Sequence, residues 1–175
     1  MNKIQSIETL IEKLNNASDD EYPSIIKSID IPPQDFEEYA EWREDKYTRN
    51  CLESNHKFEL LLLCWTQKLG SPIHGHNGQK CWVYQIMGEV EEIRYKKSNE
   101  KNFLEETYRH SLKPGQLSYM DDNMGFHMIQ NPNLTKAMTL HIYIAPITTC
   151  RVLNDDEDAF ERVKLKYDNE FQLID

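Results

Sequence analysis

The chain has 175 residues, of which 39% are hydrophobic and 29% are charged, and its formal net charge is −10. This composition is typical of a globular protein with a substantial core. The acidic balance argues against nucleic acids and anionic membranes as partners, because both need a basic surface. No apolar run approaches the roughly 20 residues of a membrane span.

The start of the chain and its thiols indicate a reducing compartment. Residues 1–5 lack the continuous apolar core of a secretory signal, so we expect a cytoplasmic protein. The four cysteines are widely spaced and form no C-x-x-C pair, which argues against a zinc ribbon. Without a signal peptide, reduced thiols are expected rather than a disulfide framework.

Residues 1–45 have the apolar spacing of helices. The first predicted helix has one apolar face, formed by Ile4, Ile7, Leu10, Ile11 and Leu14. A second short helix is predicted around residues 25–29. Pro32 and Pro33 break it, and a third helix is predicted from Asp35 to Trp42.

From Tyr47 onward the sequence has the texture of short strands separated by turn residues. The predicted strands are Tyr47–Leu52, Phe58–Trp65, Lys80–Met87, Val90–Lys96, Phe103–Leu112, Gln116–Met120, His127–Gln130, Met138–Ile144 and Val163–Phe171. This pattern indicates a mostly β fold, a small antiparallel barrel or sandwich. With no linker or repeat, we expect one domain over residues 1–175, with the helices of 1–45 packed outside a β-barrel of 46–175.

The histidines suggest a metal site. In extended backbone, alternate residues such as His74 and His76 point to one face with Cα atoms about 7 Å apart, so both imidazoles can bind one ion. A catalytic metal usually needs a third protein ligand. No acidic residue lies between His76 and Glu89, and His127, at the start of a predicted strand, is the best candidate. The alternative is that His74 and His76 are partly exposed loop residues.

A second polar group lies on the predicted strand near residue 140. Thr139, His141 and Tyr143 share one face of an extended strand and could form a hydrogen-bonded relay. The alternative is that they form the polar outer face, while the intervening apolar residues face the core. The pleat indicates that one face points inward but does not distinguish which.

A third group could bind an anion. Tyr47 and Arg49 share a face, and an inward Arg49 could hold a carboxylate with two parallel hydrogen bonds. A buried arginine would need an anionic partner, because burying it unpaired is costly. The alternative is an exposed surface arginine.

These segments together resemble the cysteine dioxygenase type I family of the cupin superfamily. The first cupin motif is H-x-H, then Glu, six residues and Gly; here Cys81 stands at the glutamate position and Gly88 follows, as in the mammalian-type members. Further similarity lies in Tyr47-Thr48-Arg49-Asn50, Leu62-Leu63-Cys64-Trp65, His127, Leu140-His141-Ile142-Tyr143 and Thr149-Cys150. The resemblance covers roughly residues 40–152 and implies a cupin fold.

The resemblance also implies roles for individual residues. The implied Fe(II) ligands are His74, His76 and His127. Tyr143 would face the iron and be hydrogen-bonded through His141 to Thr139, which replaces the family's serine. Cys81 would lie close enough to Tyr143 to form the family's thioether cross-link, a protein-derived cofactor. Gly75 stands where an acidic residue is common, and this difference is expected to loosen the turn.

The implied activity is oxidation of L-cysteine by O2 to cysteine sulfinic acid by a monomer. Arg49 would hold the substrate carboxylate, with Tyr47 nearby. Two alternatives remain. One is a 3-mercaptopropionate dioxygenase, a branch that typically lacks the arginine found here as Arg49. The other is a non-catalytic metal-binding cupin that senses a small ligand. A zinc hydrolase is disfavoured, because the sequence places no general-base carboxylate beside the histidines.

Overall fold

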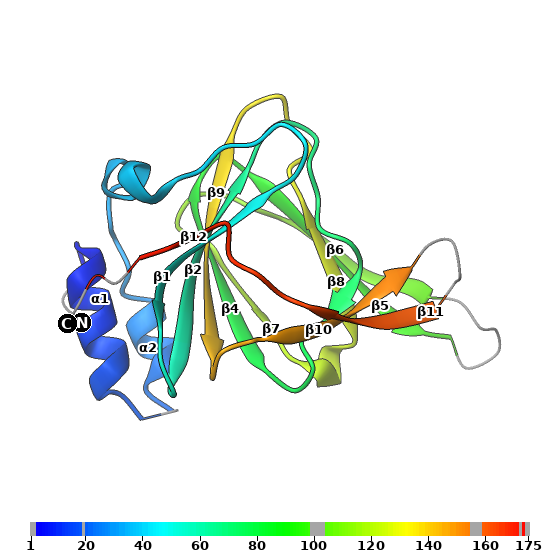
Figure 1. Ribbon diagram of the computed structural model, residues 1–175, viewed down its shortest axis with the longest axis horizontal. Helices are drawn as coiled ribbons and strands as arrows, with labels where there is room; N and C mark the ends of the chain where they lie inside the picture. Colours follow the sequence, from blue (N-terminus) through cyan, green and yellow to red (C-terminus); the bar gives the residue numbers. More distant parts are fainter. Residues whose placement is uncertain (1–2, 19, 99–103, 155–158, 172, 174–175) are drawn as a thin grey trace.

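The computed structural model describes residues 3–18, 20–98, 104–154, 159–171 and 173. Two six-stranded sheets face each other, and short helices lie against the outside of one of them (Figure 1). The helical elements are α1 (Ile7–Asn16), α2 (Tyr22–Ile26) and the 3₁₀ helices η1 (Pro33–Tyr39) and η2 (Asp122–Met124). None of the described helices is long and apolar enough to cross a membrane.

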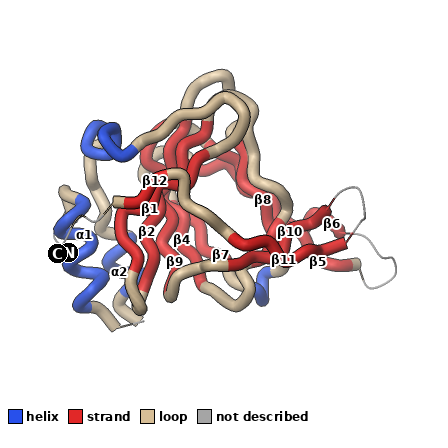
Figure 2. Tube along the Cα trace, viewed as in Figure 1, coloured by secondary structure: helices blue, strands red, loops and turns tan. Residues whose placement is uncertain are grey.

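The chain passes back and forth between the two sheets. They are β1 (Thr48–Ser54), β2 (Phe58–Trp65), β3 (His74–Gly75), β4 (Lys80–Met87), β5 (Val90–Lys97), β6 (Leu104–Leu112), β7 (Leu117–Met120), β8 (Phe126–Gln130), β9 (Ala137–Ile144), β10 (Thr149–Asn154), β11 (Ala159–Lys164) and β12 (Asn169–Glu170). The first sheet has the order β12-β1-β2-β9-β4-β7 and the second β11-β10-β3-β8-β5-β6 (Figure 2). The predicted mostly β class is confirmed, in its sandwich form, and the β1–β12 pair is parallel.

Both faces of the central strands are buried. On β2, Leu60 and Leu62 pack against the helices, whereas Leu61 and Leu63 point between the sheets. The same alternation on β9 directs Leu140 toward the helices. The prediction that the N-terminal helices pack outside the β structure is therefore confirmed. The interpretation of the other β9 face as a polar outer surface is wrong, because that face lies inside the sandwich.

Three of the element predictions need correction. Ile4 precedes the helix cap Ser6 and forms a parallel bridge with Ile29, so both are buried without being helical. The third helix is a 3₁₀ helix over Pro33–Tyr39 rather than Asp35–Trp42. The single strand Val163–Phe171 is wrong: β11 ends at Lys164 and the chain crosses to the other sheet to form β12. β3 and β10 were not predicted, and Phe103 lies outside the described residues.

One glycine of the histidine-containing segment is required by backbone geometry. Gly88, between β4 and β5, has φ +71°, and a Cβ at this position would lie 2.5 Å from the Lys136 carbonyl oxygen. A side chain would therefore collide with backbone, and only glycine adopts this φ without strain. The turn returns the chain from the first sheet to the second, where β5 pairs with β8.

Candidate metal centre and adjoining cavity

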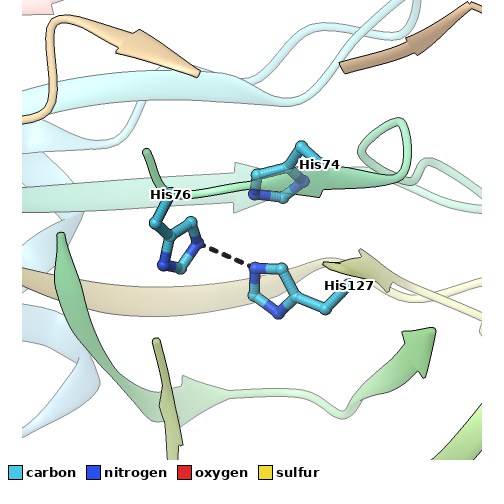
Figure 3. A group of neighbouring side chains, drawn as sticks. All are labelled: His74, His76 and His127. Atoms are coloured by element: carbon cyan, nitrogen blue, oxygen red, sulfur yellow. Dashed lines mark hydrogen bonds between the residues drawn. The ribbon is translucent and has the colours of Figure 1, made fainter. Parts of the chain in front are cut away.

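Three histidines from two segments of the chain meet between the sheets (Figure 3). His74 on β3 lies directly opposite His127 on β8, and His76 follows β3. Their donor nitrogens all lie within 4.8 Å of one another, and the Nε2 atoms of His76 and His127 are 2.9 Å apart. His76 and His127 are each 1% exposed, so the interpretation of the pair as exposed loop residues is wrong for His76.

The ring nitrogens are prepared to bind a metal. Nδ1 of His127 contacts a Glu92 carboxylate oxygen at 2.8 Å, and Nδ1 of His74 contacts the Pro72 carbonyl at 2.9 Å. Because both partners can only accept, each Nδ1 carries the proton and each Nε2 presents a lone pair. Burial and the neighbouring histidines lower the pKa of His74 to about 3 and that of His76 well below its ordinary value. Neutral imidazoles of this kind fit a divalent transition metal.

Glu92 supports this arrangement and was missed by the sequence analysis. Its carboxylate is fully buried on β5 and accepts hydrogen bonds from His127, Ser118 and Arg94. Burial alone would raise the pKa of Glu92, but these hydrogen bonds hold it at about 2. It lies on the Nδ1 side of His127, opposite the nitrogen that faces the other histidines. It therefore orients this imidazole instead of acting as the general base of a hydrolase. Glu92 lies two residues after Val90 and so shares the same buried strand face; this spacing was the signal available in the sequence.

The turn that carries His76 is held by η2. Asp122 accepts hydrogen bonds from the backbone N–H groups of His76 at 3.1 Å and Gly78 at 2.8 Å. At Gly75, a Cβ would lie 3.2 Å from the Phe126 ring, so a larger residue would press against this ring. The loosening expected at Gly75 is therefore not observed, because a carboxylate from a distant segment fixes the turn.

A cavity of about 180 Å³ adjoins the histidines. Its lining residues are Tyr47, Arg49, Pro72, His74, Tyr143, Ile147, Cys150, Val152, Val163 and Leu165. Arg49 is 8% exposed, so the interpretation of it as a surface arginine is wrong. Tyr47 stacks on Trp65 with ring centroids 4.7 Å apart. An imidazole, a phenol and a guanidinium thus line one cavity with apolar walls.

Arg49 has an anionic neighbour that the sequence analysis did not identify. Glu59 on β2 is fully buried, and its Oε2 lies 3.8 Å from Nη2 of Arg49. The hydroxyl of Tyr167 donates to the other carboxylate oxygen. Burial raises the pKa of Glu59, opposed by the Tyr167 hydrogen bond and the charge of Arg49. The signal was a single charge in an otherwise apolar strand.

The polar side chains of β9, which are Thr139, His141 and Tyr143, are only partly connected by hydrogen bonds. Trp65 Nε1 donates to Thr139 Oγ1 at 2.9 Å, and Thr139 Oγ1 lies 3.0 Å from His141 Nε2. Among the described hydrogen bonds, none continues from His141 to Tyr143, whose rings stack 6.2 Å apart. The Cys81 sulfur lies 3.9 Å from His141 Nδ1 instead. The relay expected to reach Tyr143 therefore ends at His141.

Cys81 and Tyr143 are cross-strand neighbours. They lie directly opposite each other on β4 and β9, and the ring of Tyr143 meets His76 edge-on at 5.4 Å. Burial raises the pKa of the Cys81 thiol, and a hydrogen bond with Tyr143 partly offsets this. Burial also raises the pKa of the Tyr143 phenol, so it keeps its proton near neutral pH.

Comparisons with known proteins agree with this geometry. The family model described as cysteine dioxygenase type I matches residues 2–156. Cysteine dioxygenase type 1 of Danio rerio is 29% identical over 175 residues, covering 94% of this chain and 87% of the relative. The Homo sapiens protein of the same name is 29% identical over 160 residues, covering 88% and 78%.

Solved structures show the same fold. The structure of TT1209 from Thermus thermophilus superposes with a TM-score of 0.51 at 18% identity, covering 63% of this chain and 94% of that chain. A Klebsiella pneumoniae protein with a double-stranded β-helix domain has a TM-score of 0.51 at 15% identity, covering 73% and 93%. The expected cupin fold, a double-stranded β-helix, is confirmed.

Proposed function

Because the chain belongs to the cysteine dioxygenase type I family, we propose that it is an Fe(II)-dependent enzyme that oxidises L-cysteine with O2 to cysteine sulfinic acid. The observation that carries this proposal is the convergence of His74, His76 and His127 beside the cavity lined by Arg49 and Tyr143. Imidazoles supply the metal ligands, and the guanidinium supplies a binding group for an amino-acid carboxylate.

The histidines would hold Fe(II), which supplies the redox chemistry that joins both atoms of O2 to the substrate sulfur. Because the three histidines are neutral ligands, they would leave a bound ion its full charge, which would favour the thiolate form of cysteine. Arg49 binds the substrate carboxylate and so orients the sulfur toward the histidines. Tyr143, protonated near neutral pH, donates a hydrogen bond toward the reacting groups. The apolar walls of the cavity limit access of water.

The alternatives are less well supported. A 3-mercaptopropionate dioxygenase would not be expected to contain Arg49, and a purely structural metal site needs neither Arg49 nor Tyr143 beside it. The test is oxygen consumption by the iron-loaded protein with each thiol, together with detection of the sulfinate product. Turnover of mercaptopropionate without turnover of cysteine would reject the assignment.

Glu92→Gln is expected to weaken metal binding by about 10- to 100-fold, because the partner that orients a metal-binding histidine contributes this much to affinity. The amide keeps the shape but loses the charge that fixes the His127 tautomer. Competition with a chelator of known affinity measures the change. Glu91→Gln is the matched control, since Glu91 pairs with Arg109 instead. Equal metal affinity in both variants would contradict this role for Glu92.

A Cys81–Tyr143 thioether is expected in part of the protein after turnover. A sulfur–carbon bond would form, one hydrogen would leave the thiol and one the ring, and O2 would accept the two electrons and two protons. Intact mass should fall by two hydrogens, and Cys81→Ser should abolish the lighter species. Cys64→Ser is the control, because Cys64 lies on the helix-facing side of β2. A lighter species that persists in Cys81→Ser would mean that the cross-link lies elsewhere.

A further inference from the structure

The buried ion pair of Arg49 and Glu59 has no hydrogen bond between its two charged groups. Glu59 lies opposite Tyr143 in the β2–β9 pair, and its Oε2 is 3.8 Å from Nη2 of Arg49, beyond hydrogen-bond distance. Among the described residues, neither this oxygen nor Nε and Nη2 of Arg49 has a hydrogen-bond partner. Two guanidinium nitrogens therefore keep their N–H groups available, although a carboxylate lies within reach.

The attraction between Arg49 and Glu59 should bring their charged groups into hydrogen-bond contact unless another contact holds them apart. Opposite charges in a poorly solvated interior attract strongly, and an arginine–carboxylate pair gains most when it is hydrogen-bonded. The hydroxyl of Tyr167 donates to Oε1 of Glu59 and is the contact that competes with closure. Glu59 thus lies between Arg49 on one side and two hydrogen-bonding groups on the other, the Tyr167 hydroxyl and the Ile147 backbone, and Tyr167 is its side-chain partner.

Tyr167 lies on a segment that is itself fixed. Residues 165–171, here called the strap, cross from β11 to β12 and so from one sheet to the other (Figure 1). The backbone N–H of Leu165 donates to Thr148 O at 2.9 Å, and that of Asp168 donates to Arg49 O at 2.8 Å. The side chain of Asp168 in turn accepts from the Arg49 N–H at 2.9 Å. The strap can therefore hold the Tyr167 hydroxyl in place.

We propose that Tyr167 holds Glu59 away from Arg49, so that the guanidinium stays available to the carboxylate of the substrate. Tyr167 and Glu59 are then positioning residues that act through Arg49. This inference rests on the proposed function, because it assumes a ligand with a carboxylate. Residue 167 lies outside the residues 2–156 that the family model matches. The family match therefore does not bear on Tyr167.

The test is binding of L-cysteine to the full-length, iron-loaded protein without O2, measured by calorimetry. Tyr167→Phe should weaken binding about tenfold, because the released carboxylate closes on Arg49 and competes with the substrate. Adding Glu59→Gln to Tyr167→Phe should restore most of the affinity, since the neutral amide competes poorly. Cysteamine, a thiol without a carboxylate, should bind equally to every variant. Tyr108→Phe is the control, because Tyr108 is 49% exposed.

Three results would overturn the inference. They are unchanged cysteine binding in Tyr167→Phe, a loss that Glu59→Gln does not relieve, and an equal loss for cysteamine. A crystal structure of Tyr167→Phe gives a readout independent of ligand: Glu59 and Arg49 should approach to about 3 Å, and an unchanged gap would reject the inference. Absence of oxygen consumption by the wild-type protein, with closure in the variant, would instead reject the proposed function alone.

Discussion

His127→Ala is expected to remove tight iron binding and to lower oxygen consumption with cysteine by more than about 100-fold, because even a change in the partner of a metal-binding histidine costs 10- to 100-fold in affinity. The variant loses one of three imidazoles and leaves the buried carboxylate of Glu92, which also accepts from Ser118 and Arg94, without the ring that it orients. Iron content after reconstitution and the oxygen-electrode rate are the measurements.

His56→Ala is the matched control for this prediction. His56 is exposed in the turn between β1 and β2, so its removal should change neither iron content nor rate. Thermal denaturation of both variants distinguishes loss of metal from loss of fold. A His127→Ala protein that keeps its iron and its rate would show that the three-histidine cluster is not the reaction site.

Arg49→Ala is expected to raise the KM for cysteine by about 100-fold or more, since two charge-assisted hydrogen bonds to a carboxylate are worth about 3–5 kcal/mol. The value of kcat should fall less, because the histidines remain. The variant should also lose stability, because Glu59 becomes a buried charge without its neighbouring cation. Steady-state kinetics and thermal denaturation measure the two effects separately.

Arg49→Lys separates charge from geometry at the same position. Lysine keeps the positive charge beside Glu59 but cannot present two parallel donors, so stability should recover more than KM does. Arg162→Ala, at an exposed position on β11, is the control for arginine removal. Unchanged cysteine kinetics in Arg49→Ala would show that Arg49 does not bind the carboxylate of the substrate.

Local sequence pattern predicted the strands best where both faces of the strand are buried. Phe58–Trp65 and Lys80–Met87 agree with β2 and β4 at both ends, because each is a near-continuous apolar run bounded by polar or turn residues. β3 contains only two residues, His74 and Gly75, which is too short to show any periodicity. The crossing after β11 was missed because apolar spacing does not distinguish one strand from two strands in different sheets.

For the site, the order of residues is enough to identify the chemical groups: H-x-H with Cys81, the arginine in its tyrosine-containing segment, and the alternating polar residues of β9. Which of these groups face inward, and what lies beside them, depends on how the strands pair and how the sheets pack. Glu92 reaches His127 across 35 residues and Tyr167 reaches Glu59 across 108. Such contacts depend on strand pairing and on packing between sheets. A buried charge and its partner can therefore lie far apart in the chain, with no local pattern to connect them.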